Sequence, residues 1–120
     1  MRNFKELKIW QKGFEIAVDT YKLVGSFPNT EKYSLAQQAT KSAVSISSNI
    51  AEGSSRSSGK DYNRYNRFLE ISLGSSFELE TQLLVAKAVN YGDSELINST
   101  LCKIDEEQKM LMAFIKKLHP

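Results

Sequence analysis

The chain has 120 residues, of which 41% are hydrophobic and 25% are charged, and its formal net charge is +2. These values predict one soluble globular domain over residues 1–120, and the presence of only two prolines suits long helices. The single cysteine excludes an internal disulfide framework. No apolar run approaches the ~18 residues of a membrane span, and the first ten residues do not resemble a secretory signal. We therefore expect a cytoplasmic protein without membrane contact.

The charges are distributed unevenly along the chain. Residues 1–75 carry eleven Lys or Arg and seven Asp or Glu, whereas residues 76–120 carry five and seven. The small net charge does not by itself indicate a nucleic-acid partner. The distribution nevertheless predicts a local basic face in the first part of the chain.

The first predicted helix begins near Asn3, because Asn3 and Glu6 have the spacing of a capping box. Gly25 and Pro28 end it. Apolar residues recur at steps of three and four, and we expect that side of the helix to be buried. Its members are Phe4, Leu7, Trp10, Phe14, Ala17, Val18, Tyr21 and Val24.

The second predicted helix begins around Thr30 and has an unusually small inward side. That side consists of Leu35, Ala39, Ser42, Ala43, Ile46, Asn49 and Ile50. Small residues allow two helix axes to approach closely. An antiparallel pairing with the next helix places Ala43 near Leu69 and Ala39 near Gly74.

A structural turn is predicted at Asn49, Glu52 and Gly53, with Gly53 in the left-handed conformation that ends helices. Glu52 then lies at a helix C-terminus, where the helix dipole disfavours a carboxylate. We expect Arg56 or the amides that open the next helix to bind Glu52 and latch the two helices together. A catalytic role for Glu52 is less favoured, since no second carboxylate is spaced to act with it.

The third predicted helix runs from about Gly59 to Asn90 and carries the clearest apolar seam. The seam consists of Tyr62, Tyr65, Leu69, Ser72, Ser76, Leu79, Leu83 and Ala86. A second apolar side lies off this seam and needs separate cover. We expect its members, Ile71, Phe77, Leu84 and Val85, to form an oligomer interface.

Residues 91–93 interrupt the helical pattern before the fourth predicted helix, which Asp93 or Ser94 caps. Its inward residues are Ile97, Leu101, Ile104, Gln108, Leu111, Ile115 and Leu118. Four amphipathic helices with short connections predict an all-α fold, an antiparallel up-down four-helix bundle.

The residues do not indicate a catalytic site, a metal site or a cofactor. A di-iron site in a bundle needs two Glu-x-x-His pairs, and the only histidine is His119. One cysteine and one histidine cannot form a structural zinc site, and no glycine-rich phosphate loop is present. We therefore expect a protein that is not an enzyme.

One line of basic side chains remains as a candidate nucleic-acid interface. It consists of Arg56, Lys60, Arg64 and Arg67, which share one side of the third helix. Tyr62 and Tyr65 fall between them, but the heptad pattern turns both tyrosines inward. The alternative is a solvated helix face paired with Asp61 and Glu70. A single copy would offer three or four phosphate contacts and would bind weakly at physiological salt.

Four segments resemble the bacterial four-helix-bundle proteins known as 23S rRNA intervening-sequence proteins. They are residues 4–10 (FKELKIW), 45–53 (SISSNIAEG), 68–75 (FLEISLGS) and 78–83 (ELETQL). That family is similar in turn to the accessory proteins of diversity-generating retroelements, which form pentameric rings with a basic surface and are linked to RNA and reverse transcriptase. The resemblance thus implies RNA or a nucleic-acid-associated protein as a partner.

The resemblance implies an intracellular, non-enzymatic homo-oligomer, a pentamer associated with RNA. Two interpretations follow from the sequence. The first is an RNA-binding or ribonucleoprotein accessory module that uses the basic face. The second is a structural module for protein–protein interaction without nucleic-acid binding.

Overall fold

The computed structural model describes residues 3–31, 33–55 and 62–118. Four α-helices contain most of these residues, and the short 3-10 helices η1 (Phe4–Glu6) and η2 (Asn29–Glu31) precede the first two. The α-helices are α1 (Lys8–Val24), α2 (Leu35–Ser55), α3 (Tyr62–Ala88) and α4 (Ser94–Leu118).

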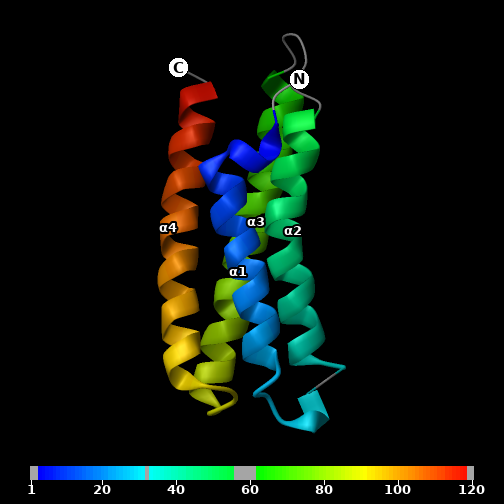
Figure 1. The fold of residues 1–120 in the computed structure, drawn as a ribbon, viewed down its shortest axis with the longest axis vertical. Helices are drawn as coiled ribbons and strands as arrows, with labels where there is room; N and C mark the ends of the chain where they lie inside the picture. Colours follow the sequence, from blue (N-terminus) through cyan, green and yellow to red (C-terminus); the bar gives the residue numbers. More distant parts are fainter. Residues whose placement is uncertain (1–2, 32, 56–61, 119–120) are drawn as a thin grey trace.

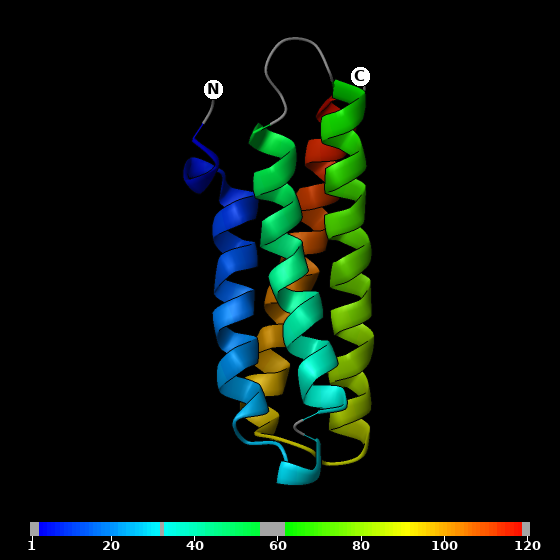
Figure 2. The same ribbon diagram turned by 90° about the vertical axis from the view of Figure 1, so that its right-hand side faces the viewer.

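The helices run alternately up and down and form an elongated bundle of 47 × 22 × 20 Å (Figure 1). α1 and α3 each pack against both α2 and α4 (Figure 2). The diagonal pairs, α1 with α3 and α2 with α4, make no close backbone approach within the described residues. This arrangement is the predicted up-down four-helix bundle. No helix in the described part of the chain combines the length and apolar character of a membrane span.

The buried side of α3 follows the predicted seam. Its described members are almost or completely inaccessible: Tyr65, Leu69, Ser72, Ser76, Leu79, Leu83 and Ala86. The serines of the seam are buried with partners. Ser72 Oγ donates to the carbonyl of Ile46, 2.8 Å away, and Ser76 Oγ donates to the carbonyl of Leu73, 2.6 Å away. Small hydroxyl residues thus let α2 approach α3 without leaving a buried donor unsatisfied.

The pairing of α2 with α3 differs in register from the prediction. The predicted pairing of Ala43 with Leu69 would set Ile46 opposite residue 66, whereas Ile46 bonds to Ser72. The displacement is about two helical turns, so the same faces still meet. Its physical reason is that α2 extends beyond Gly53, which moves the chain reversal further along the sequence.

Gly53 lies inside α2 and does not end it, contrary to the prediction. It is buried where α2 crosses α3, and a Cβ atom there would lie 2.8 Å from Cβ of Phe68 and 3.0 Å from Cδ1 of Tyr65. Gly53 is therefore needed for close packing of the two helices. The only described residues with positive φ are Asn90 and Gly92.

Asn49 and Glu52, the other two residues of the predicted turn, also lie within α2. Asn49 Nδ2 donates to the carbonyl of Ser45, one turn earlier in α2, at 2.8 Å. The Asn49 side chain therefore bonds within the helix and does not form a turn. Glu52 is exposed in the last turn of α2. Its predicted latch partner Arg56 lies outside the described residues.

The predicted buried side of the first helix is only partly buried: Ala17 is buried, and Leu7, Trp10 and Val24 pack partly buried against the core. The side of α1 that is fully buried lies next to it. Its buried residues are Ile9, Gly13, Ile16, Ala17, Thr20 and Leu23. Phe14 and Tyr21 are instead 51% and 59% exposed. The two sides are adjacent on the helix, and the aromatic one is the more hydrophobic in sequence. Gly13 and Thr20 lower the hydrophobicity of the side that is buried. Thr20 is nevertheless buried, and its hydroxyl donates to the carbonyl of Ile16 at 2.7 Å.

Two helices begin later than predicted. Asn3 does act as a cap, but its side chain accepts from the amide of Lys5 and caps η1. Leu7 then adopts an extended conformation, and α1 begins at Lys8. Similarly, the predicted start of the second helix corresponds to η2, and α2 begins at Leu35.

The predicted cap of the fourth helix is confirmed. Asp93 Oδ1 accepts from the amides of Glu95 and Leu96 at 2.9 and 3.2 Å. The preceding Gly92 has φ of 82°, and a Cβ atom there would lie 2.8 Å from Cε1 of Phe27. Glycine at 92 therefore satisfies both the backbone conformation and the available space.

Candidate nucleic-acid interface

Two of the four predicted basic residues lie in the described part of the chain. Arg64 and Arg67 have exposed side chains in the first two turns of α3. Arg56 and Lys60 lie outside the described residues. A helix places side chains three residues apart on the same side, so Arg64 and Arg67 can face one ligand together.

The tyrosine between the two arginines is a core residue. Tyr65 is 3% exposed, and its ring packs edge-on against Phe114 of α4, with centroids 5.8 Å apart. Its inward heptad position predicted this burial. The carboxylate of Glu70, considered as a partner of the arginines, accepts from Nδ2 of Asn66 at 3.0 Å.

The bundle brings further basic side chains to the end where α3 begins. η1, the start of α1, the end of α2 and the end of α4 all lie at this end (Figure 1). The exposed basic residues described there are Lys5, Lys8, Arg64, Arg67, Lys116 and Lys117. The exposed carboxylates described there are Glu6, Glu52 and Glu70. We call this surface the basic end.

The opposite end of the bundle has a different charge balance. Its described basic residues are Lys22, Lys41 and Lys87, and its described acidic residues are Glu31, Asp93 and Glu95. Among the described residues, the excess of positive charge is therefore found at the basic end. Lys116 and Lys117 belong to the basic end although they come from the more acidic part of the sequence, because an up-down bundle of four helices returns the chain to the end where it started.

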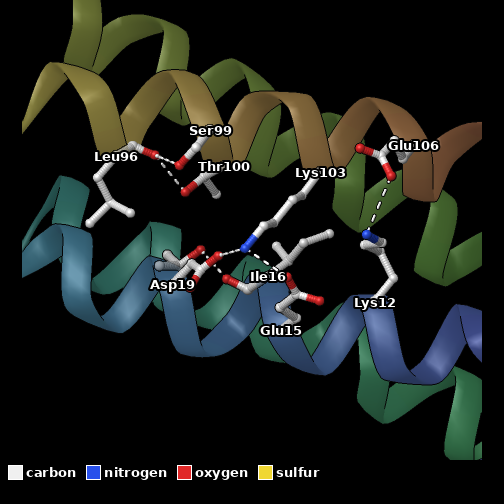
Figure 3. A network of polar contacts seen from close by, with 10 residues as sticks. Lys12, Glu15, Ile16, Asp19, Leu96, Ser99, Thr100, Lys103 and Glu106 are labelled. Carbon is white, nitrogen blue, oxygen red and sulfur yellow. Dashed lines mark hydrogen bonds and ion pairs between the residues drawn. The ribbon is translucent and has the colours of Figure 1, made fainter.

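Three carboxylates between the two ends form contacts between α1 and α4 (Figure 3). Lys103 Nζ of α4 lies 2.7 Å from Glu15 Oε1 and 2.5 Å from Asp19 Oδ2 of α1. Hydrogen bonds to Asp19 and Glu15 raise the pKa of Lys103, and the bond from Lys103 lowers the pKa of Glu15. Lys12 Nζ and Glu106 Oε2 form a further pair at 3.3 Å. These groups join the helices.

A buried carboxyl group on α4 was not predicted. Glu107 is completely inaccessible, and neither of its oxygens has a hydrogen-bond partner within the described part of the chain. Burial raises its pKa to about 8, although the charge of Lys12 acts in the opposite direction. Gly13 of α1 leaves room for it, since a Cβ atom at Gly13 would lie 3.0 Å from Glu107 Oε2. Glu107 follows Ile104 by three residues, a spacing that could have revealed its inward position.

The described residues offer no arrangement typical of a metal site. Among them, no three His, Cys, Asp or Glu side chains are grouped closely enough to hold an ion. Cys102 is a free and exposed thiol.

Exposed apolar residues occur on two pairs of helices, α3 with α4 and α1 with α2. The residues predicted as an oligomer interface on α3 are 44–48% exposed: Ile71, Phe77, Leu84 and Val85. Met112 of α4 is 46% exposed. Gln108, one turn before Met112, donates to Glu80, one turn after Phe77, at 2.9 Å. Because α3 and α4 are antiparallel, this bond brings the turns that carry Met112 and Phe77 side by side. The second surface was not predicted and consists of Phe14, Val18 and Tyr21 on α1 with Val44 on α2.

The comparisons with known proteins agree with this fold. A family model described as 23S rRNA-intervening sequence protein matches residues 5–113. The chain is also similar to a crystal structure from Bacteroides thetaiotaomicron, that of a protein of unknown function from the S23 ribosomal protein family. The two chains share 25% sequence identity and a TM-score of 0.77, over 90% of this chain and 98% of the other. No significant match was found among curated proteins.

Proposed function

The chain belongs to the 23S rRNA-intervening sequence protein family, and we propose that it is a non-enzymatic accessory module that binds RNA through its basic end. The observation that carries this proposal is the gathering of six exposed Lys and Arg side chains at one end of the bundle, against three exposed Glu, among the described residues. Such a surface attracts phosphates and releases their counterions. The predicted residues Arg56, Lys60, Arg64 and Arg67 belong to this proposed interface.

Self-association strengthens the proposal. The few phosphate contacts that one copy offers bind RNA weakly at physiological salt, whereas several linked copies act at a high effective concentration. The exposed apolar residues of α3 supply a surface through which copies could associate. We accordingly propose that the protein acts as a homo-oligomer, and a pentamer is the assembly that the sequence resemblance implies.

Fluorescence anisotropy with a labelled structured RNA tests the binding function. We expect binding at about 50 mM salt, with log affinity falling linearly against log salt concentration. Replacing both Arg64 and Arg67 by Ala should weaken binding and lower the steepness of this dependence by about two.

The matched control replaces two lysines of the opposite end, Lys22 and Lys87, by Ala. It removes the same number of charges and should leave RNA affinity nearly unchanged. Absence of binding at low salt, or equal losses in the two double variants, would contradict the proposed function.

The second candidate function is a protein-interaction module that does not bind nucleic acid. The extent of exposed apolar surface on α3 and α4 favours it. It predicts that the protein assembles normally but that RNA anisotropy stays flat at every salt concentration. The same titration therefore distinguishes the two functions.

A further inference from the structure

An apolar groove opens at the basic end, between the start of α1 and the end of α4. Its volume is about 420 Å³. The apolar residues lining it are Leu7, Ile9, Met110, Ala113 and Phe114. The polar residues lining it are Glu6, Lys8 and Lys117. The groove is thus a hydrophobic site within a charged surface.

An aromatic ring is held in a fixed position at this groove. Phe114 is partly buried, and Tyr65 of α3 packs against it at an interplanar angle of 60°. Because Tyr65 is itself almost inaccessible, the ring of Phe114 is anchored to the core of the bundle. A ligand that packs on Phe114 would meet a surface that needs little ordering on binding.

Positive charge surrounds the groove on two helices. Lys8 and Lys117 are both exposed, and Glu6 is the one carboxylate among the lining residues. α1 begins at this point with Leu7 as its N-cap, which provides no side-chain hydrogen bond to the first turn. The positive end of the helix dipole adds to the charge of the two lysines. The groove therefore suits a ligand that joins an apolar group to an anionic one.

We propose that the groove binds one unstacked base of a single-stranded RNA, with the flanking phosphates on Lys8 and Lys117. A nucleobase has a flat apolar face next to an anionic backbone, which matches the groove in both respects. A duplex cannot supply this ligand without breaking a base pair. This inference rests on the proposed RNA binding and adds the class of RNA that the basic end prefers.

A groove-filling substitution tests the inference without removing any charge. Ala113 lines the groove and is exposed, so Ala113→Trp should occupy the groove and leave the core intact. The control is Ala88→Trp, at an exposed alanine in the last turn of α3 at the opposite end. Circular dichroism should show equal helical content for both variants and the wild type.

The probes are a labelled unstructured RNA of about ten nucleotides, within the range of single-strand site sizes, and a blunt RNA duplex that contains the same sequence. We expect Ala113→Trp to weaken single-strand binding about tenfold, the order of one lost stacked base, and to change duplex binding little. Ala88→Trp should change neither affinity.

Three outcomes would overturn the inference. If Ala113→Trp leaves single-strand binding unchanged while replacing Arg64 and Arg67 by Ala weakens it, the groove has no part in RNA binding, and the proposed function stands. If neither RNA binds the wild type, the proposed function fails as well. If a labelled acidic peptide with one central Phe binds the wild type, and Ala113→Trp abolishes only that binding, the groove is a peptide site.

Discussion

At the scale of single residues, Glu107 is the least expected side chain in the bundle. A buried carboxyl group without a hydrogen-bond partner is costly when charged, so it favours the neutral form. Its pKa of about 8 lies above the ordinary value of 4.5. The folded protein consequently holds one proton more than the unfolded chain between these two pH values.

This difference fixes how Glu107 affects stability with pH. The contribution of neutral Glu107 to the free energy of unfolding is complete below pH ~4.5. It is lost progressively as the pH rises to about 8, by at most roughly 1.4 kcal/mol per pH unit. We predict that Glu107→Gln, which cannot ionise, removes this loss. The variant should gain stability over the wild type as the pH rises from about 5 to about 8, as measured by urea unfolding.

The control for this experiment is Glu78→Gln, at an exposed position on α3. Its unfolding free energy should follow that of the wild type at every pH. If the Glu107→Gln curve also runs parallel to the wild type, Glu107 is ionised in the folded protein and its carboxylate has found a partner.

At the scale of elements, the packing of α2 on α3 depends on a glycine and on small side chains. Gly53 lies at the crossing with Phe68 and Tyr65, where a Cβ atom would come within 3.0 Å of both. At Gly74 of α3, in contrast, a Cβ atom would have no neighbour from another helix within 4 Å. The two glycines occupy helix interiors, but only Gly53 is required by its surroundings.

We therefore predict opposite effects of alanine at the two positions. Gly74→Ala should raise the unfolding free energy by about 0.5–1 kcal/mol, because alanine is the better helix former. Gly53→Ala should lower it by about 1–3 kcal/mol, because overpacking outweighs that gain. Denaturant unfolding of the two variants beside the wild type measures both. Stabilisation by Gly53→Ala would mean that α3 can shift away at no cost.

At the scale of the whole molecule, the question is what covers the apolar surface of α3. Burying a side chain such as Phe77 or Leu84 contributes roughly 1.5–3 kcal/mol, less the entropy lost on association. The second apolar surface, on α1 and α2, lies on other helices of the bundle. Two different surfaces on one subunit suit a head-to-tail contact, which closes into a ring when the rotation allows it.

We predict an assembly whose mass is a multiple of 13.6 kDa, five-fold for a pentamer. Light scattering at micromolar concentration measures this mass. Phe77→Asp should dissociate the assembly while leaving the helical content unchanged, because the side chain is exposed in the single subunit. Asn98→Asp, which adds the same charge at an exposed position on α4, should not dissociate it.

A monomer mass for the wild type would rule out the assembly. Unfolding of Phe77→Asp would instead show that Phe77 supports the subunit itself, and the interface would then have to be sought on the α1–α2 surface.

The sequence by itself determined the helical class, the number of helices and the buried seam of α3. These follow from periodicity, because a seam from Leu69 to Ala86 is apolar or small at every inward position. The cap at Asp93 was predictable because it is local: it depends only on hydrogen bonds to residues two and three places further along the chain. Of the candidate site, Arg64 and Arg67 could be placed on one face of a helix from their spacing alone.

Only the tertiary structure decided which of two adjacent sides of α1 is buried, since that depends on the shapes of α2 and α4. It also decided the role of Gly53, which packing against Phe68 requires and which looked like a helix end in the sequence. The basic end likewise follows only from the tertiary structure. Lys8 and Lys117 are far apart in the sequence and line one groove, because antiparallel packing sets the start of α1 beside the end of α4.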